Sequence, residues 1–120
     1  MSRLFLPRLV NSWVCDRLSD FAIWAINAYP AEHYGLVIWD HGSSWLGVAS
    51  DDSGTDDQVL DLIEVDQALA AITRTTGIGK LDVLGFDACL MGSFEVYQAV
   101  APYAHYGVAS AELIPGSGWD

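Results

Sequence analysis

The sequence has few basic residues. Five lysines and arginines stand against sixteen aspartates and glutamates, which gives a formal net charge of −11 at pH 7. Most of such a surface would repel a phosphate backbone, so we expect no nucleic-acid partner. The same acidic excess could steer a basic peptide toward the protein or hold cations, or it could serve only to keep the protein soluble.

Cysteines and long apolar runs are also scarce. The two cysteines, Cys15 and Cys89, lie far apart in the chain, which argues against a disulfide framework or a zinc site but still allows a single catalytic thiol. No apolar run approaches the ~20 residues that a membrane helix requires, so we expect no membrane partner. The first 16 residues are interrupted by Pro7, Arg8 and Asn11 and make a poor secretory signal, which leaves the compartment open.

The spacing of apolar residues predicts alternating helices and strands. Hydrophobic residues make up 52% of the chain, enough to build a core. The pattern predicts helices at residues 19–29, 65–76 and 90–101, strands at residues 34–39, 81–86 and 106–114, and a long loop over residues 41–58. Strands separated by helices need crossover connections, so we predict an α/β fold with a mostly parallel sheet sandwiched by helices in an α/β/α arrangement.

Three local features accompany this pattern. Ser19 is expected to cap the first helix at its N-terminus, and Trp39 is expected to pack in the core. The loop contains the stretch DDSGTDD at residues 51–57, which could bind calcium. It lacks the spacing of an EF-hand, so we favour a solvated acidic loop and predict no metal or other cofactor.

The ends of the first two predicted strands carry residues that can perform chemistry. They read Asp40-His41-Gly42 and Asp87-Ala88-Cys89, at the edge where parallel sheets bind ligands. If the strands are neighbours, the histidine can take the thiol proton and later protonate a leaving amine. The backbone N–H groups of the glycine and the cysteine could bind an oxyanion. We also expect the cysteine to stand at the N-terminus of the next helix, which would stabilise a thiolate.

Each of these residues has a simpler explanation when it is considered alone. A lone cysteine is more often a small core residue than a nucleophile, and a lone histidine after a strand is more often an ordinary loop residue. Their joint occurrence at equivalent ends of two apolar strands favours chemistry. Cys89 follows His41 by 48 residues, close to the interval of about 50 residues in the caspase signature.

Three stretches of the sequence resemble a known family. LVIWDHGSSW, LDVLGFDACLMGSFEV and VASAELIPGSGWD are similar to the clostripain family of cysteine peptidases, which are relatives of caspases, legumains and gingipains. The likeness runs from about Leu18 to Asp120. It implies a caspase-like fold, a catalytic dyad of His41 and Cys89, and an oxyanion hole formed by Gly42 and Cys89. It also implies a peptide or protein substrate that is cleaved after arginine or lysine.

The resemblance suggests substrate-binding residues as well. Asp87 resembles the carboxylate that receives the basic P1 side chain, and a purely structural carboxylate is the alternative. Ser110, Glu112 and Asp120 lie at or beyond the third predicted strand, near where a peptide would pass, and Glu112 or Asp120 could assist in binding a basic P1 residue. Trp119 could form a wall of the same pocket.

The resemblance also bears on domain organisation. Members of the family are much longer than this chain, so we expect residues 17–120 to form part of a caspase-like peptidase domain, with residues 1–16 unassigned. The alternative function is a non-catalytic or truncated peptidase-like binding module, although the intact His41 and Cys89 favour catalysis. An unrelated flavodoxin-like domain is disfavoured because no glycine-rich phosphate loop follows the first strand.

Overall fold

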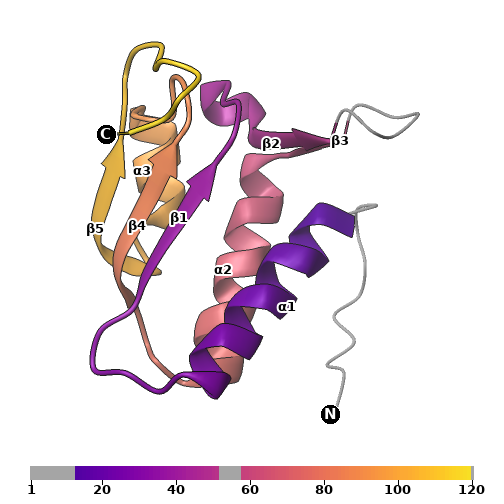
Figure 1. Ribbon diagram of the computed structural model, residues 1–120, viewed down its shortest axis with the longest axis vertical. Helices are drawn as coiled ribbons and strands as arrows, with labels where there is room; N and C mark the ends of the chain where they lie inside the picture. Colours follow the sequence, from indigo (N-terminus) through magenta and orange to yellow (C-terminus); the bar gives the residue numbers. More distant parts are fainter. Residues whose placement is uncertain (1–12, 52–57, 120) are drawn as a thin grey trace.

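The computed structural model describes residues 13–51 and 58–119 of the 120-residue chain. Residues 1–12 and Asp120 therefore lie outside the described residues, as does all but the first residue of the acidic stretch at residues 51–57. In chain order the elements are helix α1 (Trp13–Ala28), strand β1 (Gly35–Trp39), the short 3₁₀ helix η1 (Ser44–Leu46), strands β2 (Val48–Asp51) and β3 (Gln58–Leu60), helix α2 (Leu62–Thr76), strand β4 (Leu81–Asp87), helix α3 (Phe94–Val100) and strand β5 (Ala104–Ala109) (Figure 1).

The main sheet has three parallel strands in the order β1-β4-β5. Strand β1 pairs with β4 from Gly35 opposite Val83 to Trp39 opposite Asp87. Helices flank this sheet, as Figure 1 shows. The predicted fold class is therefore confirmed: the chain is an α/β protein with a parallel sheet flanked by helices.

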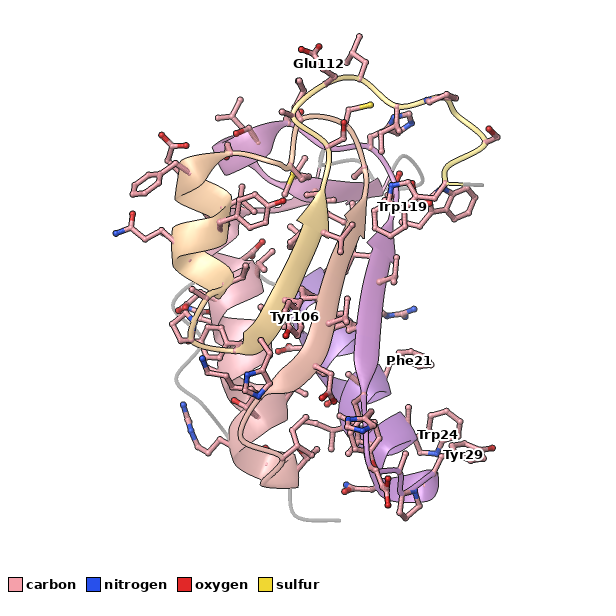
Figure 2. All side chains as sticks on the ribbon, turned by 90° about the vertical axis from the view of Figure 1, so that its left-hand side faces the viewer. Phe21, Trp24, Tyr29, Tyr106, Glu112 and Trp119 are labelled. Atoms are coloured by element: carbon pink, nitrogen blue, oxygen red, sulfur yellow. The ribbon has the colours of Figure 1, made fainter. Side chains whose placement is uncertain are left out.

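Within the described residues, the helices cover one face of the sheet rather than both (Figures 1 and 2). Crossovers between parallel strands are right-handed in nearly all proteins. Because β1, β4 and β5 follow one another in a single direction, two crossovers of the same hand put α2 and α3 on the same side. A crossover helix on the other side would require the strand order to reverse, and the described strands contain no reversal.

The opposite face, which we call the uncovered face, carries apolar side chains that are open to solvent. Trp39 is 66% exposed, so the prediction that it packs in the core is wrong. Side chains alternate along a strand, and Ile38 takes the buried position beside it. Tyr106, labelled in Figure 2, stands on the same face and is 71% exposed. The other exposed apolar residues that the strands carry on this face are Val37, Val83 and Val108.

The core lies between the covered face of the sheet and helix α2. Val65, Leu69 and Ile72 of α2 are fully buried, as their helical spacing predicts. Leu84 and Phe86 of β4 belong to the same apolar cluster and are likewise buried. Helix α1 packs beside α2 and contributes Cys15 and Ala22 to the same core (Figure 1). One continuous core therefore supports the strands from the helical side.

The stretch between β1 and α2 is not the plain loop that the sequence predicts. It contains η1 and an antiparallel hairpin of β2 and β3 on either side of residues 52–57. Val48 pairs with Leu60 in this hairpin, and both side chains are buried. Single apolar residues separated by a polar stretch give no periodic signal, which explains why the pairing was not predicted.

Two helix starts also differ from the prediction. Helix α1 begins at Trp13, and Ser19 lies inside it, where its hydroxyl donates a hydrogen bond to the Cys15 carbonyl at 3.1 Å. Ser19 is therefore not an N-cap. Helix α3 begins at Phe94 rather than near residue 90, with Ser93 as its N-cap. None of the described helices is long and apolar enough to cross a membrane.

We predict that replacing Asp61 destabilises the fold through helix α2. Its side chain accepts the Glu64 N–H at 2.8 Å, and the Glu64 carboxylate accepts the Asp61 N–H at 3.0 Å, which together form a capping box. Asp61→Ala should lower the free energy of unfolding by about 1 kcal/mol, measured by urea denaturation. Asp61→Asn keeps an accepting oxygen and is the control. Equal stability of the two variants would contradict the capping role.

Candidate active site

The register of the sheet brings the two predicted catalytic segments to the same edge. Trp39 is the Cα partner of Asp87, and the next residue of β1, Asp40, donates its N–H to the Asp87 carbonyl at 3.4 Å. His41 and Cys89 each lie two residues beyond the paired Trp39 and Asp87. The backbone therefore confirms that both residues follow neighbouring parallel strands.

Gly42 packs directly against the turn that carries Cys89. A Cβ atom at position 42 would collide with the carbonyl oxygen of Cys89, and it would lie 2.9 Å from Cγ of Met91 and 3.0 Å from Cβ of Ala88. The Met91 and Ala88 side chains are buried and cannot easily move aside. Access of the backbone N–H to an oxyanion is one reason to expect a residue without a side chain here, and this close packing is a second reason.

The hairpin holds the His41-Gly42 segment from its other side. The His41 carbonyl accepts the Ala49 N–H at 3.0 Å, and Gly42 forms an isolated antiparallel bridge with Val48. The His41 N–H donates to the carboxylate of Asp40 at 2.6 Å. These bonds fix the backbone of the segment, while the His41 side chain is exposed to solvent.

Cys89 lies in a turn and not at a helix N-terminus. Helix α3 begins at Phe94, after its cap Ser93, so the expected stabilisation of a thiolate by the start of this helix is not available. Leu90, directly after the cysteine, has a φ of 60°, in the left-handed region that residues with a side chain seldom adopt. The chain turns sharply there, and the Cys89 side chain is half-buried.

The sulfur of Cys89 hydrogen-bonds Ile114 in this structure. The Ile114 N–H lies 3.3 Å from Sγ, and the Ile114 carbonyl accepts the thiol at 3.7 Å. Within the part of the chain that the structure describes, no hydrogen bond joins the sulfur to the His41 ring. The Cys-His dyad therefore stays a prediction, supported by the placement of the two backbone segments.

Residues 110–119, which we call the arm, follow β5 and cross the carboxyl end of β4. The Leu90 N–H donates to the Glu112 carbonyl at 3.1 Å, and the Gly92 N–H donates to the Ser110 carbonyl at 2.7 Å. Position 92 has no room for a side chain, because a Cβ atom there would lie 2.7 Å from the Ser110 carbonyl carbon. The arm is thus paired with the chain just after Cys89.

The structure places three of the four predicted substrate-binding residues at this end of the sheet. The Ser110 hydroxyl accepts the Glu112 N–H at 3.1 Å, and the Glu112 side chain lies on the outer side of the arm (Figure 2). The Asp87 carboxylate accepts the Trp119 N–H at 3.1 and 3.0 Å, which is what a structural carboxylate would do. Asp120 lies outside the described residues. Binding of substrate by these residues stays a prediction.

The backbone contacts of Ile114 and Trp119 were not predicted from the sequence. Both contacts use main-chain N–H groups, which any residue except proline carries, so residue type gave no signal. One signal was present in Gly85, because a glycine inside a strand often marks a close approach by another group. The Trp119 ring fills that space, with atoms 2.9 and 3.1 Å from where a Gly85 Cβ would stand.

Two shifted pKa values belong to the opposite, amino end of the sheet. The Tyr34 N–H donates to the Asp82 carboxylate at 2.8 Å, and this hydrogen bond is the main cause of the lowered pKa of Asp82. The hydrogen bond from the His33 ring is the second cause. The pKa of Tyr103 is raised, mainly because the side chain is partly buried and secondly because its hydroxyl hydrogen-bonds the Asp66 carboxylate. Among the described residues, no group of three or more histidine, cysteine or acidic side chains could hold a metal ion.

We predict that Gly42→Ala disrupts the site. The added methyl group would meet the carbonyl oxygen of Cys89, so the Cys89 turn must shift. Covalent labelling of Cys89 by a peptide inhibitor should slow by at least about tenfold, because small misplacements of reacting groups cost that much. Gly35→Ala is the matched control, since a Cβ atom there meets only ordinary contacts at 3.8 Å or more. Unchanged labelling of the Gly42 variant would contradict the tight packing.

Comparison with known proteins gives an independent view of this arrangement. Solved structures similar to the chain include a secreted C11 cysteine protease from Bacteroides thetaiotaomicron in complex with an irreversible peptide inhibitor, with 30% identity over 87% of this chain and a TM-score of 0.73. An inactive zymogen C11 protease from Parabacteroides distasonis has 25% identity over 98% of this chain and a TM-score of 0.59. A structure of a secreted C11 cysteine protease from B. thetaiotaomicron named iotapain is 19% identical over 87% of this chain, with a TM-score of 0.66, and supports the fold alone.

The chain spans only 29% to 32% of the length of these structures. No curated protein matches the sequence. A family model described as the clostripain family, peptidase C11, matches residues 8–120, which is most of the chain. Together with the 30% identical structure, this match shows that the chain belongs to the clostripain family of cysteine peptidases.

Proposed function

We infer that this chain carries the catalytic centre of a cysteine endopeptidase, with Cys89 as nucleophile and His41 as its acid/base partner. The observation that carries the inference is the packing of the His41-Gly42 segment against the Cys89 turn at the carboxyl ends of two paired parallel strands. Membership of a cysteine peptidase family supports the reaction type. Because the chain spans about three tenths of its structural relatives, the activity of the whole protein is part of this proposal.

The proposed reaction uses the two segments in sequence. His41 takes the proton of the Cys89 thiol, and the thiolate attacks the peptide carbonyl carbon to give a tetrahedral oxyanion. The N–H groups of Gly42 and Cys89 are the proposed donors to that oxyanion. His41 then protonates the leaving amine, and a thioester to Cys89 remains. Water, activated by His41, hydrolyses the thioester and regenerates the thiol.

For this reaction the imidazole must come within hydrogen-bonding distance of the thiol or its substrate. The His41 side chain is exposed and stands on a backbone fixed by the hairpin, so rotation about its side-chain bonds is the movement required. Catalytic hydrogen bonds are often loose in the absence of substrate. The hydrogen bonds between the Cys89 sulfur and the Ile114 backbone must also break or lengthen when the sulfur becomes acylated.

We further infer a preference for arginine or lysine at P1. The net charge of −11 favours basic peptides over acidic ones, and Asp40 and Glu112 add negative charge near the candidate site. Asp87, Ser110, Glu112 and Asp120 are the candidate residues that would line the substrate site. The peptide inhibitor bound to the 30% identical B. thetaiotaomicron protease supports a peptide as the ligand of this family.

The second candidate function is a peptidase-like binding module without catalysis. The observation that favours it is the sulfur of Cys89, which is hydrogen-bonded to Ile114 and not to His41 in the described structure. Such a module would bind a peptide at the same edge of the sheet but would form no bond with it. A covalent probe therefore separates the two functions.

We predict that a peptide acyloxymethyl ketone with P1 arginine labels Cys89 of the full chain, and does so faster than the same probe with P1 aspartate. Cys89→Ala should abolish labelling. Cys15→Ala should leave it intact, because Cys15 is buried at 6% exposure and packs between α1 and α2. Intact-mass spectrometry measures the adduct. No labelling by either probe would support the binding module, and equal labelling by both would contradict the basic preference.

We also predict that the protein does not cleave itself between His41 and Cys89. Residues 42–60 contain no arginine or lysine. The two basic residues of the interval are Arg74, in the last turn of α2, and Lys80, directly before β4. Helical and sheet-bound backbone must unfold locally before a protease can accept it as an extended substrate. Mass-spectrometric mapping of new N-termini checks this. A cut in residues 42–60 that Cys89→Ala abolishes would contradict the basic specificity.

A further inference from the structure

Strand β1 has one edge that pairs with no other strand among the described residues, and we call it the open edge. Its opposite edge pairs with β4 along the whole strand. Backbone groups of successive residues in a strand point to opposite edges. The Asp40 N–H points to β4, so Leu36 and Ile38 point there too, while Val37 and Trp39 direct their N–H and C=O groups to the open edge. Such an edge is a template for a further strand.

The position of α1 indicates which part of the chain belongs at the open edge. Helix α1 packs beside α2 on the covered side of the sheet and runs antiparallel to β1 (Figure 1). The chain passes from β1 through α2 to β4 by a crossover on this side. A right-handed crossover through α1 on the same side must cross the sheet in the same direction, so it starts beyond the open edge of β1. The residues before Trp13, where α1 begins, are therefore the ones that the topology assigns to this edge.

The sequence before α1 contains a segment that suits an edge strand. Residues 4–10 read LFLPRLV and are apolar except for Arg8. Seven extended residues span about 23 Å, enough to run along the whole of β1. Residues 11–12 would then link the strand to α1, and links of this length are common between a strand and a helix. Pro7 has no N–H group and is tolerated only where that side of the strand faces away from the sheet, which an edge strand provides.

Pro7 also selects one orientation of this strand. With Pro7 facing outward, the even-numbered residues of the segment direct their N–H groups to β1. In β1, Ile38 directs its backbone toward β4 and its side chain to the covered face. Parallel strands of one sheet share this relation between backbone and side chain, so the even-numbered side chains also fall on the covered face. These are Leu4, Leu6, Arg8 and Val10.

Helix α1 presents an aromatic surface where these side chains would arrive. Phe21, Trp24 and Tyr29 are 60%, 50% and 68% exposed, and their ring centroids follow one another at 6.1 and 6.0 Å. Figure 2 shows the three rings beyond the β1 side of the sheet, away from β4. The exposed Asp20 adjoins them in the sequence, whereas residues 1–12 contain two of the five basic residues of the chain and no acidic one. Aromatic faces attract both apolar groups and an arginine.

We propose that residues 4–10 bind along the open edge of β1 as a fourth parallel strand, with Pro7 facing outward and the even-numbered side chains facing the aromatic rings of α1. Backbone hydrogen bonds from Val37 and Trp39 hold this strand. It gives β1, the strand that leads to His41 and Gly42, a partner on both edges. The proposal does not depend on the proposed peptidase activity.

Two pairs of variants of the full chain test this orientation at positions of the same residue type. Leu6→Pro and Leu6→Ala both lose the leucine side chain, but only proline removes the N–H that faces β1. Leu9→Pro and Leu9→Ala are the matched control pair, because the N–H of residue 9 faces outward. Comparison within each pair isolates the backbone hydrogen bond from the loss of the side chain. Circular dichroism checks that all four variants are folded.

The measurement is amide hydrogen exchange of Val37 and Trp39, resolved by NMR. We expect both amides to be protected in the wild-type chain and to exchange about tenfold faster in Leu6→Pro than in Leu6→Ala, since a lost backbone hydrogen bond typically costs that much. The two Leu9 variants should exchange alike. Ile38, which is paired with β4, is the internal reference. Unprotected Val37 and Trp39 in the wild-type chain, or the same effect of proline at both positions, would overturn the proposal.

A second molecule of the chain is the other candidate occupant of the open edge. Its binding would make the protection of Val37 and Trp39 rise with protein concentration, and the protection would persist in Leu6→Pro. Exchange at low and high protein concentration, together with sedimentation velocity, distinguishes the two occupants. Protection that depends on concentration and is equal in the two Leu6 variants would overturn the proposal. Neither measurement requires catalysis, so an inactive peptidase leaves the test intact.

Discussion

The contact between Gly42 and the Cys89 turn depends on the in-register pairing of β1 with β4. Parallel strands lie about 4.8 Å apart, and a shift by one residue would turn every side chain to the other face. The buried Ile38 and Phe86 fix the register, because they must face helix α2 on the covered side. Once they do, the backbone beyond the strands approaches so closely that only glycine fits at position 42. The core thus determines the spacing of the site.

The hairpin and the arm complete the site from opposite sides. The hairpin of β2 and β3 makes backbone contacts with His41 and Gly42. The arm accepts backbone hydrogen bonds from Leu90 and Gly92, just after the cysteine. Most of these contacts are main-chain hydrogen bonds, which have little freedom once the strands are set. The His41 side chain, by contrast, is exposed and makes no such contact among the described residues. The site therefore combines a fixed backbone with a movable imidazole.

The sequence predicted the features that depend on periodic apolar residues. Strands β1 and β4, helix α2 and its end at Gly77 all follow from such patterns, as does the position of the His41 and Cys89 backbone segments at one edge of the sheet. The hairpin was missed because its core is a single pair of apolar residues, Val48 and Leu60. The start of α3 was misjudged because Leu90 looks helical in the pattern but takes a left-handed turn.

The contacts of the arm were beyond prediction for a different reason. Ile114 and Trp119 act through main-chain N–H groups, and Asp87 gives no sign in the sequence of whether its partner is a backbone or a substrate. The position of helices on a single face could be derived only from the strand order, which periodicity does not reveal. Contacts made by the main chain therefore gave no signal in the residue types.

The uncovered face has a consequence for how the isolated chain behaves in solution. Its valines, Trp39 and Tyr106 form an apolar surface on which two molecules would tend to associate. The net charge of −11 opposes such association through long-range repulsion. Salt weakens this repulsion, because the screening length falls from ~30 Å at 0.01 M to ~8 Å at physiological ionic strength, while apolar attraction persists. The colloidal stability of the chain should therefore decrease as ionic strength rises.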